Sequence, residues 1–223
     1  MIHLGTIRGT TIGVDVSFLI LIGLWVASYY DPRVGIQHAL LWAPVLFFSV
    51  LIHEFAHAAA IGLFGYGPSE IVLGGIGGAT MNRRKAKAWH DVLISLAGPL
   101  SSFALAYMVR FIYWRVPVAQ RDPMLAEFLP LLIIMNVWWG EFNLIPVAPL
   151  DGGHAVRNFF RIFLDERRAF LIAVWIAMIC GTAVVAWAAF QAHSLLLAVL
   201  IGWFVFMNYQ SWQYYRDHGT PGD

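Results

Sequence analysis

Long apolar runs separated by short polar segments dominate the hydrophobic pattern of the chain. Six runs can be marked along the sequence, and they cover residues 16–30, 39–64, 89–113, 125–148, 168–190 and 194–213. A helix needs about 20 residues to cross the hydrocarbon core of a bilayer, which is about 30 Å thick, so most of these runs are long enough and the first is marginal. The pattern therefore predicts an all-α polytopic membrane protein with six transmembrane helices.

Two stretches outside these runs favour β-structure. β-Prone residues alternate over Ile2–Arg8 and Thr11–Val16 around Gly9, which predicts a small hairpin at the membrane surface. The segment Glu70–Met81 is too glycine-rich for a stable helix and too apolar for an ordinary solvated loop. We expect it to form a short strand or hairpin that dips toward the membrane. Its backbone must then be buried in protein or line a wet cavity, and a cavity near His53 would meet this need.

The remaining segments indicate a single domain over residues 1–223. Apolar side chains at helical spacing face arginine and asparagine side chains over Gly153–Leu164, which predicts a helix lying in the membrane interface. The tail Arg216–Asp223 is short and polar, and neither internal repeats nor a linker to a second folded domain can be recognised. The start of the chain lacks the basic region and cleavage site of a secretory signal, so we expect the first apolar run to be retained.

Composition supports the membrane assignment and narrows the partners. The chain is 60% hydrophobic and 12% charged, whereas an ordinary soluble domain is about 45–50% apolar and about 25% charged. The net charge of +1 and the lack of a dense basic cluster beyond Arg83, Arg84, Lys85 and Lys87 argue against a nucleic-acid partner. Cys180 is the only cysteine, so no intrachain disulfide can form, and we expect it to behave as a small buried apolar residue.

The distribution of basic residues predicts the orientation in the membrane. With six spans, both termini lie on one side, and 10 of the 14 Lys and Arg residues fall on that side. By the positive-inside rule, both termini are cytoplasmic in a multi-pass protein of the cell membrane. The second span runs toward the same side, so its C-terminal half should approach the cytoplasm.

An HExxH motif lies in that half of the second span, at His53, Glu54 and His57. Residues four apart on a helix lie one above the other, so both imidazoles can approach one metal ion with Glu54 beside them. This geometry is typical of zinc-dependent hydrolases.

A catalytic zinc usually takes three protein ligands. The best candidate for the third is Asp151, in the segment 143–153, where two prolines break the fourth apolar run and two glycines close it. The alternative is that these side chains merely hydrogen-bond between helices or cap a helix end. An ionised acid near the bilayer centre costs about 2.5–3.5 kcal/mol, whereas a structural zinc site supplies about 10–16 kcal/mol, which favours a bound metal.

These residues are similar to the two motifs of the site-2 protease family, the zinc intramembrane metalloproteases. The resemblance extends to Gly13–Phe18, to the glycine pair Gly74-Gly75 and to Ala97–Leu100, and so covers nearly the whole chain. It departs from the family at Ser102, where an asparagine is common, and we expect Ser102 to serve helix packing. The family's PDZ and CBS domains have no counterpart here, so we expect a minimal catalytic core.

The resemblance implies the chemistry and the roles of individual residues. One zinc ion per chain would be held by His53, His57 and Asp151, and Glu54 would be the general base. Asn143, which opens the second motif, would contact the substrate, and we add Asn136 and Pro149 as further candidates for that contact. The implied activity is that of a zinc-dependent intramembrane endopeptidase, which hydrolyses peptide bonds in or next to transmembrane segments of membrane proteins. The sequence leaves the substrate and the oligomeric state open.

Three other functions compete with this one. A polytopic metal-ion or proton transporter would also bury histidines and acids, but it does not explain why Glu54 lies between two ligands in the hydrolase order. A catalytically inactive scaffold should lack a ligand or the base, and none is missing. A prenyl-protein protease also carries an HExxH motif, but its third ligand is a glutamate, and the second motif supplies Asp151 instead.

Overall fold

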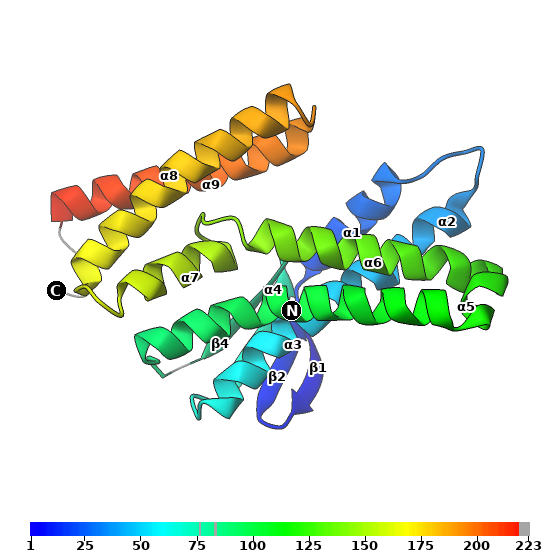
Figure 1. Ribbon diagram of the computed structural model, residues 1–223, viewed down its shortest axis with the longest axis horizontal. Coiled ribbons are helices and arrows are strands. Elements are labelled where there is room, and N and C mark those ends of the chain that lie inside the picture. Colours follow the sequence, from blue (N-terminus) through cyan, green and yellow to red (C-terminus); the bar gives the residue numbers. More distant parts are fainter. Residues whose placement is uncertain (76, 83, 219–223) are drawn as a thin grey trace. The chain divides into compact units, whose positions relative to one another are not determined.

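The computed structural model describes residues 1–75, 77–82 and 84–218. Arg83 of the basic cluster, Ile76 of the predicted hairpin and the last five residues of the tail (219–223) lie outside the described residues. The elements follow one another along the chain as shown in Figure 1. They are β1 (Ile2–Ile7), β2 (Thr10–Val14), α1 (Val16–Ser28), α2 (Ile36–Leu40), α3 (Trp42–Leu63), β3 (Ser69–Gly74), β4 (Gly77–Asn82), α4 (Ala88–Arg115), α5 (Pro117–Arg121), α6 (Pro123–Asn143), α7 (Asp151–Phe160), α8 (Glu166–Phe190) and α9 (Leu195–His218).

Five helical segments of the described chain are long and apolar enough to cross a membrane. They are Ile36–Leu63, Ala88–Arg115, Pro123–Asn143, Glu166–Phe190 and Leu195–Asp217, and each matches one predicted run. The first predicted run forms only the 13-residue helix α1. Such a helix is about 20 Å long, which is short of the hydrocarbon thickness of about 30 Å. The helix-rich membrane fold is confirmed, with five candidate spans rather than six.

A four-stranded sheet in the order β1-β2-β3-β4 joins both predicted hairpins. β1 and β2 are antiparallel, and Arg8 and Gly9 between them have φ angles of 49° and 84°. Two consecutive positive φ angles form the tight turn that matches the twist of a hairpin. β3 and β4 form the predicted glycine-rich hairpin, and β2 pairs with β3 in parallel. That parallel pairing, which the sequence pattern does not predict, makes β3 an inner strand and leaves β4 as the outer strand next to it.

The protein divides into two compact units, each made of residues that contact mainly one another. The first unit comprises Met1–Lys85 and Ala97–Glu141. Its core includes Ile71 and Leu73 of β3, which are wholly buried together with Phe18 of α1 and residues of α3. Asp15 caps α1 by accepting hydrogen bonds from the hydroxyl (2.6 Å) and the backbone N–H (2.9 Å) of Ser17. These bonds stabilise the carboxylate and lower the pKa of Asp15.

The second unit comprises Ala86–Leu96 and Phe142–Asp223. In it α8 and α9 lie side by side, as Figure 1 shows, and Gly181 of α8 lets Val205 of α9 approach closely. The segment predicted to lie in the interface forms α7, whose Gly152, Gly153 and Ala155 are buried. The polar Arg157 and Asn158 lie between apolar side chains along this helix, so α7 has the expected amphipathic sequence, and Phe159 is exposed on it.

Candidate metal centre and base

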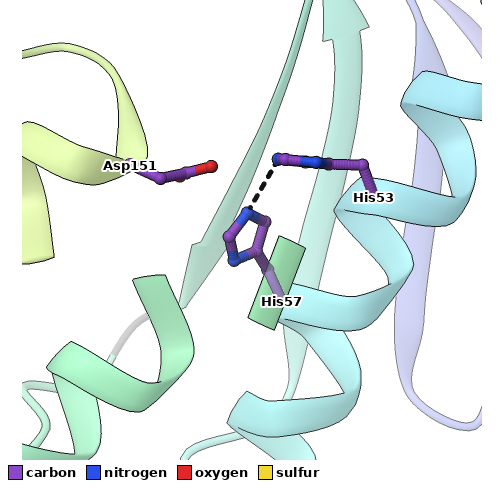
Figure 2. Close-up of side chains that lie close together, drawn as sticks. All are labelled: His53, His57 and Asp151. Atoms are coloured by element: carbon purple, nitrogen blue, oxygen red, sulfur yellow. Dashed lines mark hydrogen bonds between the residues drawn. The ribbon is translucent and has the colours of Figure 1, made fainter. Parts of the chain in front are cut away.

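Two imidazoles converge within the apolar helix α3. His53 and His57 are one turn apart, are only 2% and 6% exposed, and place their Nε2 atoms 3.2 Å from each other. Figure 2 shows both rings with this contact as a dashed line. A hydrogen bond between two Nε2 atoms needs a proton on one of them, and a metal ion bound to both would replace that proton. The predicted histidine pair therefore has its metal-binding atoms facing each other.

The separation of these nitrogens fits a zinc ion. Two nitrogens bound to one tetrahedral zinc at about 2.0–2.1 Å each are about 3.3 Å apart, close to the 3.2 Å found here. Asp151 offers a third ligand atom, and one atom from each of His53, His57 and Asp151 lies within 4.8 Å of the other two (Figure 2). The donor set of two imidazoles and a carboxylate suits zinc, so the residues present fit the ion that the sequence implies.

Gly98 of α4 keeps the space around the imidazole nitrogens open. A Cβ atom on Gly98 would lie 2.5 Å from His53 Nε2 and 2.7 Å from His57 Cε1, and closer still to His57 Nε2. Real Cβ atoms essentially never approach other heavy atoms within 3.0 Å. Any other residue at this position would therefore place its side chain against the atoms that are to bind the metal.

Ser102, one turn further along α4, touches the other side of His53. Its hydroxyl lies 3.0 Å from His53 Nδ1, and Ser102 is wholly buried. When a metal occupies Nε2, the proton of the ring resides on Nδ1, and the serine hydroxyl then accepts it in a hydrogen bond. In addition to the packing expected of it, Ser102 therefore makes a polar contact with a predicted ligand.

Glu54 is 5% exposed and lies against β4. The hydroxyl of Thr80 donates to Glu54 Oε2 at 2.7 Å and lies 3.1 Å from the main-chain oxygen of Glu54. Gly78, two residues earlier on the same strand, leaves room for the glutamate side chain, because a Cβ there would lie 2.5 Å from Glu54 Cγ. The predicted general base is thus contacted by two residues of one strand.

Asp151 is the first residue of α7, and the two glycines after it explain how the motif packs. A Cβ on Gly152 would lie 2.5 Å from the carbonyl carbon of Leu144, and one on Gly153 would lie 2.6 Å from that of Val147. Both atoms belong to the backbone, which moves far less easily than a side chain. Only glycine at these two positions therefore lets the first turn of α7 pack against the loop that carries the motif.

The three predicted substrate-contact residues differ in accessibility. Asn143 ends α6 and is 9% exposed, whereas Pro149 is exposed after a cis peptide bond with Ala148. Asn136 is wholly buried, and its amide donates to Ser49 Oγ at 2.8 Å and to the Leu132 carbonyl at 2.9 Å. Its position links α6 to α3 one turn before His53.

Sequence reasoning did not predict that Gly98, Ser102, Gly78 and Thr80 lie against the candidate ligands and base, and it assigned Ser102 to helix packing. Gly98 and Ser102 are four residues apart on α4, so their shared face was a usable signal. For Thr80 and Gly78 the signal is that residues two apart on a strand point to the same face. It identifies a contact with Glu54 only when the register of β4 and the helix that it faces are known.

Comparisons with known proteins agree with the motifs. The model of the family described as "Peptidase family M50" matches residues 115–186. The chain is 26% identical to "Putative zinc metalloprotease sll0528" of Synechocystis over 93% of its own length and 58% of that protein. It is 30% identical to "Putative zinc metalloprotease Rip3" of Mycobacterium tuberculosis over 92% of its own length and 56% of that protein. The chain thus spans little more than half the length of these relatives.

A solved structure supports the fold. The site-2 protease from Methanocaldococcus jannaschii superposes with a TM-score of 0.62 over 94% of each chain, at 24% sequence identity. At this identity the likeness concerns the arrangement of the elements. Together, these comparisons agree with the resemblance that the two motifs indicate: part of the chain matches peptidase family M50, the chain is similar to zinc metalloproteases, and its fold is similar to that of a site-2 protease.

Proposed function

We propose that this chain is a zinc-dependent intramembrane endopeptidase that cleaves membrane proteins in or next to their transmembrane segments. The observation that carries the proposal is the pair of buried Nε2 atoms 3.2 Å apart on an apolar helix, with Glu54 beside them in the HExxH order. The names of the two relatives, both zinc metalloproteases, support the same activity.

His53, His57 and Asp151 are the proposed ligands of one zinc ion per chain. A zinc ion held by them would lower the pKa of a water molecule and polarise the carbonyl of the peptide bond under attack. Ser102 holds the ring of His53 in place, and Gly98 leaves the ligand atoms uncovered.

Glu54 is the proposed general base and acid. Its carboxylate accepts a proton from the attacking water, and it then delivers that proton to the amide nitrogen as the peptide bond breaks. The buried setting of Glu54 keeps bulk water from competing for this proton. The two oxygens of the new carboxyl group then come from the carbonyl and the attacking water, and the glutamate returns to its starting state.

A substrate helix must be unwound before its carbonyls can react, because helical carbonyls are bound internally. An extended substrate could pair with the sheet as an added strand, which recognises main-chain groups and tolerates many sequences. β4 is the outer strand next to Glu54, whereas β3 lies between β2 and β4. The pairing surface is therefore β4, and N-methylation of substrate amides beside the cleaved bond should slow hydrolysis. Asn143 and Pro149 remain candidates for contact with the same segment.

The proposed membrane arrangement keeps residues 1–223 as one catalytic domain with both termini in the cytoplasm. Five helical segments are long enough to span, and α1 completes a sixth crossing only if the bilayer thins or neighbouring polar segments enter it. Fusions of a reporter that is active on one side of the membrane, placed before Met1 and after Asp217, test this arrangement. Both termini on the same side require an even number of crossings.

The experiment that tests the activity uses purified protein in detergent and single-span membrane proteins with tags at both ends. The wild type should cut a tagged protein within its apolar segment, and Glu54→Gln should retain zinc and lose cleavage by several orders of magnitude. Glu54→Gln that cleaves like the wild type would contradict the proposal. If wild type in liposomes instead moves metal ions or protons, and Glu54→Gln stops this movement, the transporter alternative holds.

A further inference from the structure

Two residues of strand β4, Thr80 and Gly78, lie against the side chain of Glu54, the proposed base on α3. We propose that Thr80 is a positioning residue for the reaction: its hydroxyl, together with the space left by Gly78, holds the Glu54 carboxylate in the orientation required for proton transfer. This inference rests on the proposed endopeptidase function. It assigns to strand β4 a catalytic task that is separate from binding the substrate backbone.

The register of the sheet places Thr80 at this position. Thr80 is paired with Ile71 and Gly78 with Leu73 in the antiparallel β3–β4 ladder. Opposed residues of such a ladder point to the same face, and Ile71 and Leu73 are wholly buried in the core beside α3. A slip of one residue would turn this whole face outward, so the buried pair on β3 fixes which β4 side chains face α3.

The hydrogen bond of Thr80 acts on the carboxylate itself. The hydroxyl has one proton to donate, and its shorter contact is to Glu54 Oε2 at 2.7 Å, against 3.1 Å to the main-chain oxygen. Donation to one oxygen fixes the plane of a carboxylate that otherwise rotates broadly about its last torsion. Threonine is branched at Cβ, which restricts its own rotamers and makes it a firm support.

Gly78 lies on the same strand as Thr80. Because it has no side chain, β4 approaches Glu54 closely and limits the positions that the glutamate side chain can take. A Cβ at position 78 would lie 2.5 Å from Glu54 Cγ, 2.6 Å from Oε1 and 2.7 Å from Cδ. The glutamate would have to move by about 1 Å to restore an ordinary carbon–carbon contact. Residues 78 and 80 alternate with the exposed Ala79, so one face of β4 carries both contacts.

Strand β4 belongs to a hairpin that is held in place by hydrogen bonds to α1, so its position does not depend on its contact with Glu54. The backbone N–H of Gly75, between β3 and β4, donates to Ser17 Oγ at 2.7 Å, and Ser17 is tied to Asp15 at the start of α1. The backbone N–H of Asp15 in turn donates to the Leu73 carbonyl at 2.7 Å. Thr80 therefore orients Glu54 from a strand whose position is set by α1 and β2.

The test compares Thr80→Val, which keeps the shape and removes the hydroxyl, with Thr80→Ser, which keeps the hydroxyl. Loss of such a supporting partner typically costs about 10–100-fold in activity. We expect Thr80→Val to lower kcat by this factor with KM, zinc content and the midpoint of thermal unfolding unchanged, and Thr80→Ser to restore kcat to within about 3-fold. A merely structural role would instead lower the unfolding midpoint and affect both variants.

A second pair of variants tests the steric contact. Gly78→Ala should lower kcat with zinc retained, whereas Gly62→Ala on α3, where a new Cβ meets nothing within 4 Å, should behave like the wild type. Because Thr80 acts through Glu54, Thr80→Val should add nothing to Glu54→Gln.

The outcomes separate this inference from the proposed function. A zinc-loaded wild type that cleaves no membrane protein would overturn the endopeptidase assignment, and the inference with it. A wild type that cleaves, with Thr80→Val equally active, would overturn the role of Thr80 alone. Thr80→Val that loses zinc or unfolds earlier would show that the residue supports the fold and not the base.

Discussion

Replacing Gly98 with alanine should remove zinc from a protein that still folds. The added Cβ would lie 2.5 Å from His53 Nε2, and restoring a separation of 3.0 Å requires a shift of at least 0.5 Å, with a larger shift for His57 Nε2. Metal–ligand distances tolerate only about ±0.2 Å. The shift therefore exceeds the tolerance, and we expect a loss of zinc affinity of at least about 100-fold, which corresponds to about 2.7 kcal/mol.

The helix itself should not suffer from this change. Alanine favours a helix interior over glycine by about 1 kcal/mol, so α4 gains local propensity while the metal site loses its space. The assay is zinc content after equilibration against a chelator of known affinity, with far-UV circular dichroism and size-exclusion chromatography as checks of folding. Gly62→Ala, whose Cβ would meet nothing within 4 Å, is the matched control. A folded Gly98→Ala that binds zinc as tightly as the wild type would refute the reasoning.

Three further predictions follow from other contacts. Ser102→Ala should weaken zinc binding by about 10–100-fold because it removes the hydroxyl that contacts buried His53 Nδ1; a chelator titration checks this, and unchanged affinity would return Ser102 to a packing role. Gly153→Ala should destabilise the fold by about 1–3 kcal/mol through overpacking against the backbone. Thermal unfolding in detergent measures it, beside the control Gly202→Ala, whose Cβ would have its nearest neighbour 3.9 Å away. Because folding lowers the pKa of Asp15, its carboxylate stabilises the fold at pH values above its ordinary pKa of 3.8. This contribution is lost as the pH falls through the lowered pKa. Asp15→Asn should therefore flatten the dependence of the unfolding midpoint on pH in that acidic range, and an unchanged dependence would contradict the role of the cap.

The long helices were the easiest part of the fold to predict. Apolar length alone marked all five of the candidate spans in the described chain, because exposure to lipid demands continuous hydrophobicity. The first span was predicted too long. Its helix ends at Ser28, and Pro32 disfavours helical backbone at Asp31, so the helix could not have extended far beyond the predicted run.

The joining of the two hairpins could not be predicted from local pattern. β2 ends at Val14 and β3 begins at Ser69, and α1 to α3 lie between them. Periodicity identifies strands but not which distant strands pair, so the parallel ladder and the outer position of β4 emerge only in the structure.

The ligand candidates were accessible to sequence reasoning, but the residues that support them were not. His53 and His57 follow from their helical spacing. Asp151 follows from the carboxylate that stands where two prolines break the fourth apolar run. Ser102 was interpreted from its small size, because its depth against α3 is unknown without the packing of α4. Thr80 gave no chemical signal of its own, since a threonine on a strand is ordinary until its hydroxyl is seen on Glu54.

The measurement that tests the central claim most directly is the zinc content of purified wild type beside His53→Ala and Asp151→Ala, because it requires no knowledge of the substrate. We predict about one zinc ion per wild-type chain and none retained by either variant under the same chelator. A wild type that cannot be loaded with zinc, or zinc that stays bound after Asp151 is removed, would contradict the three-ligand centre on which the account is built.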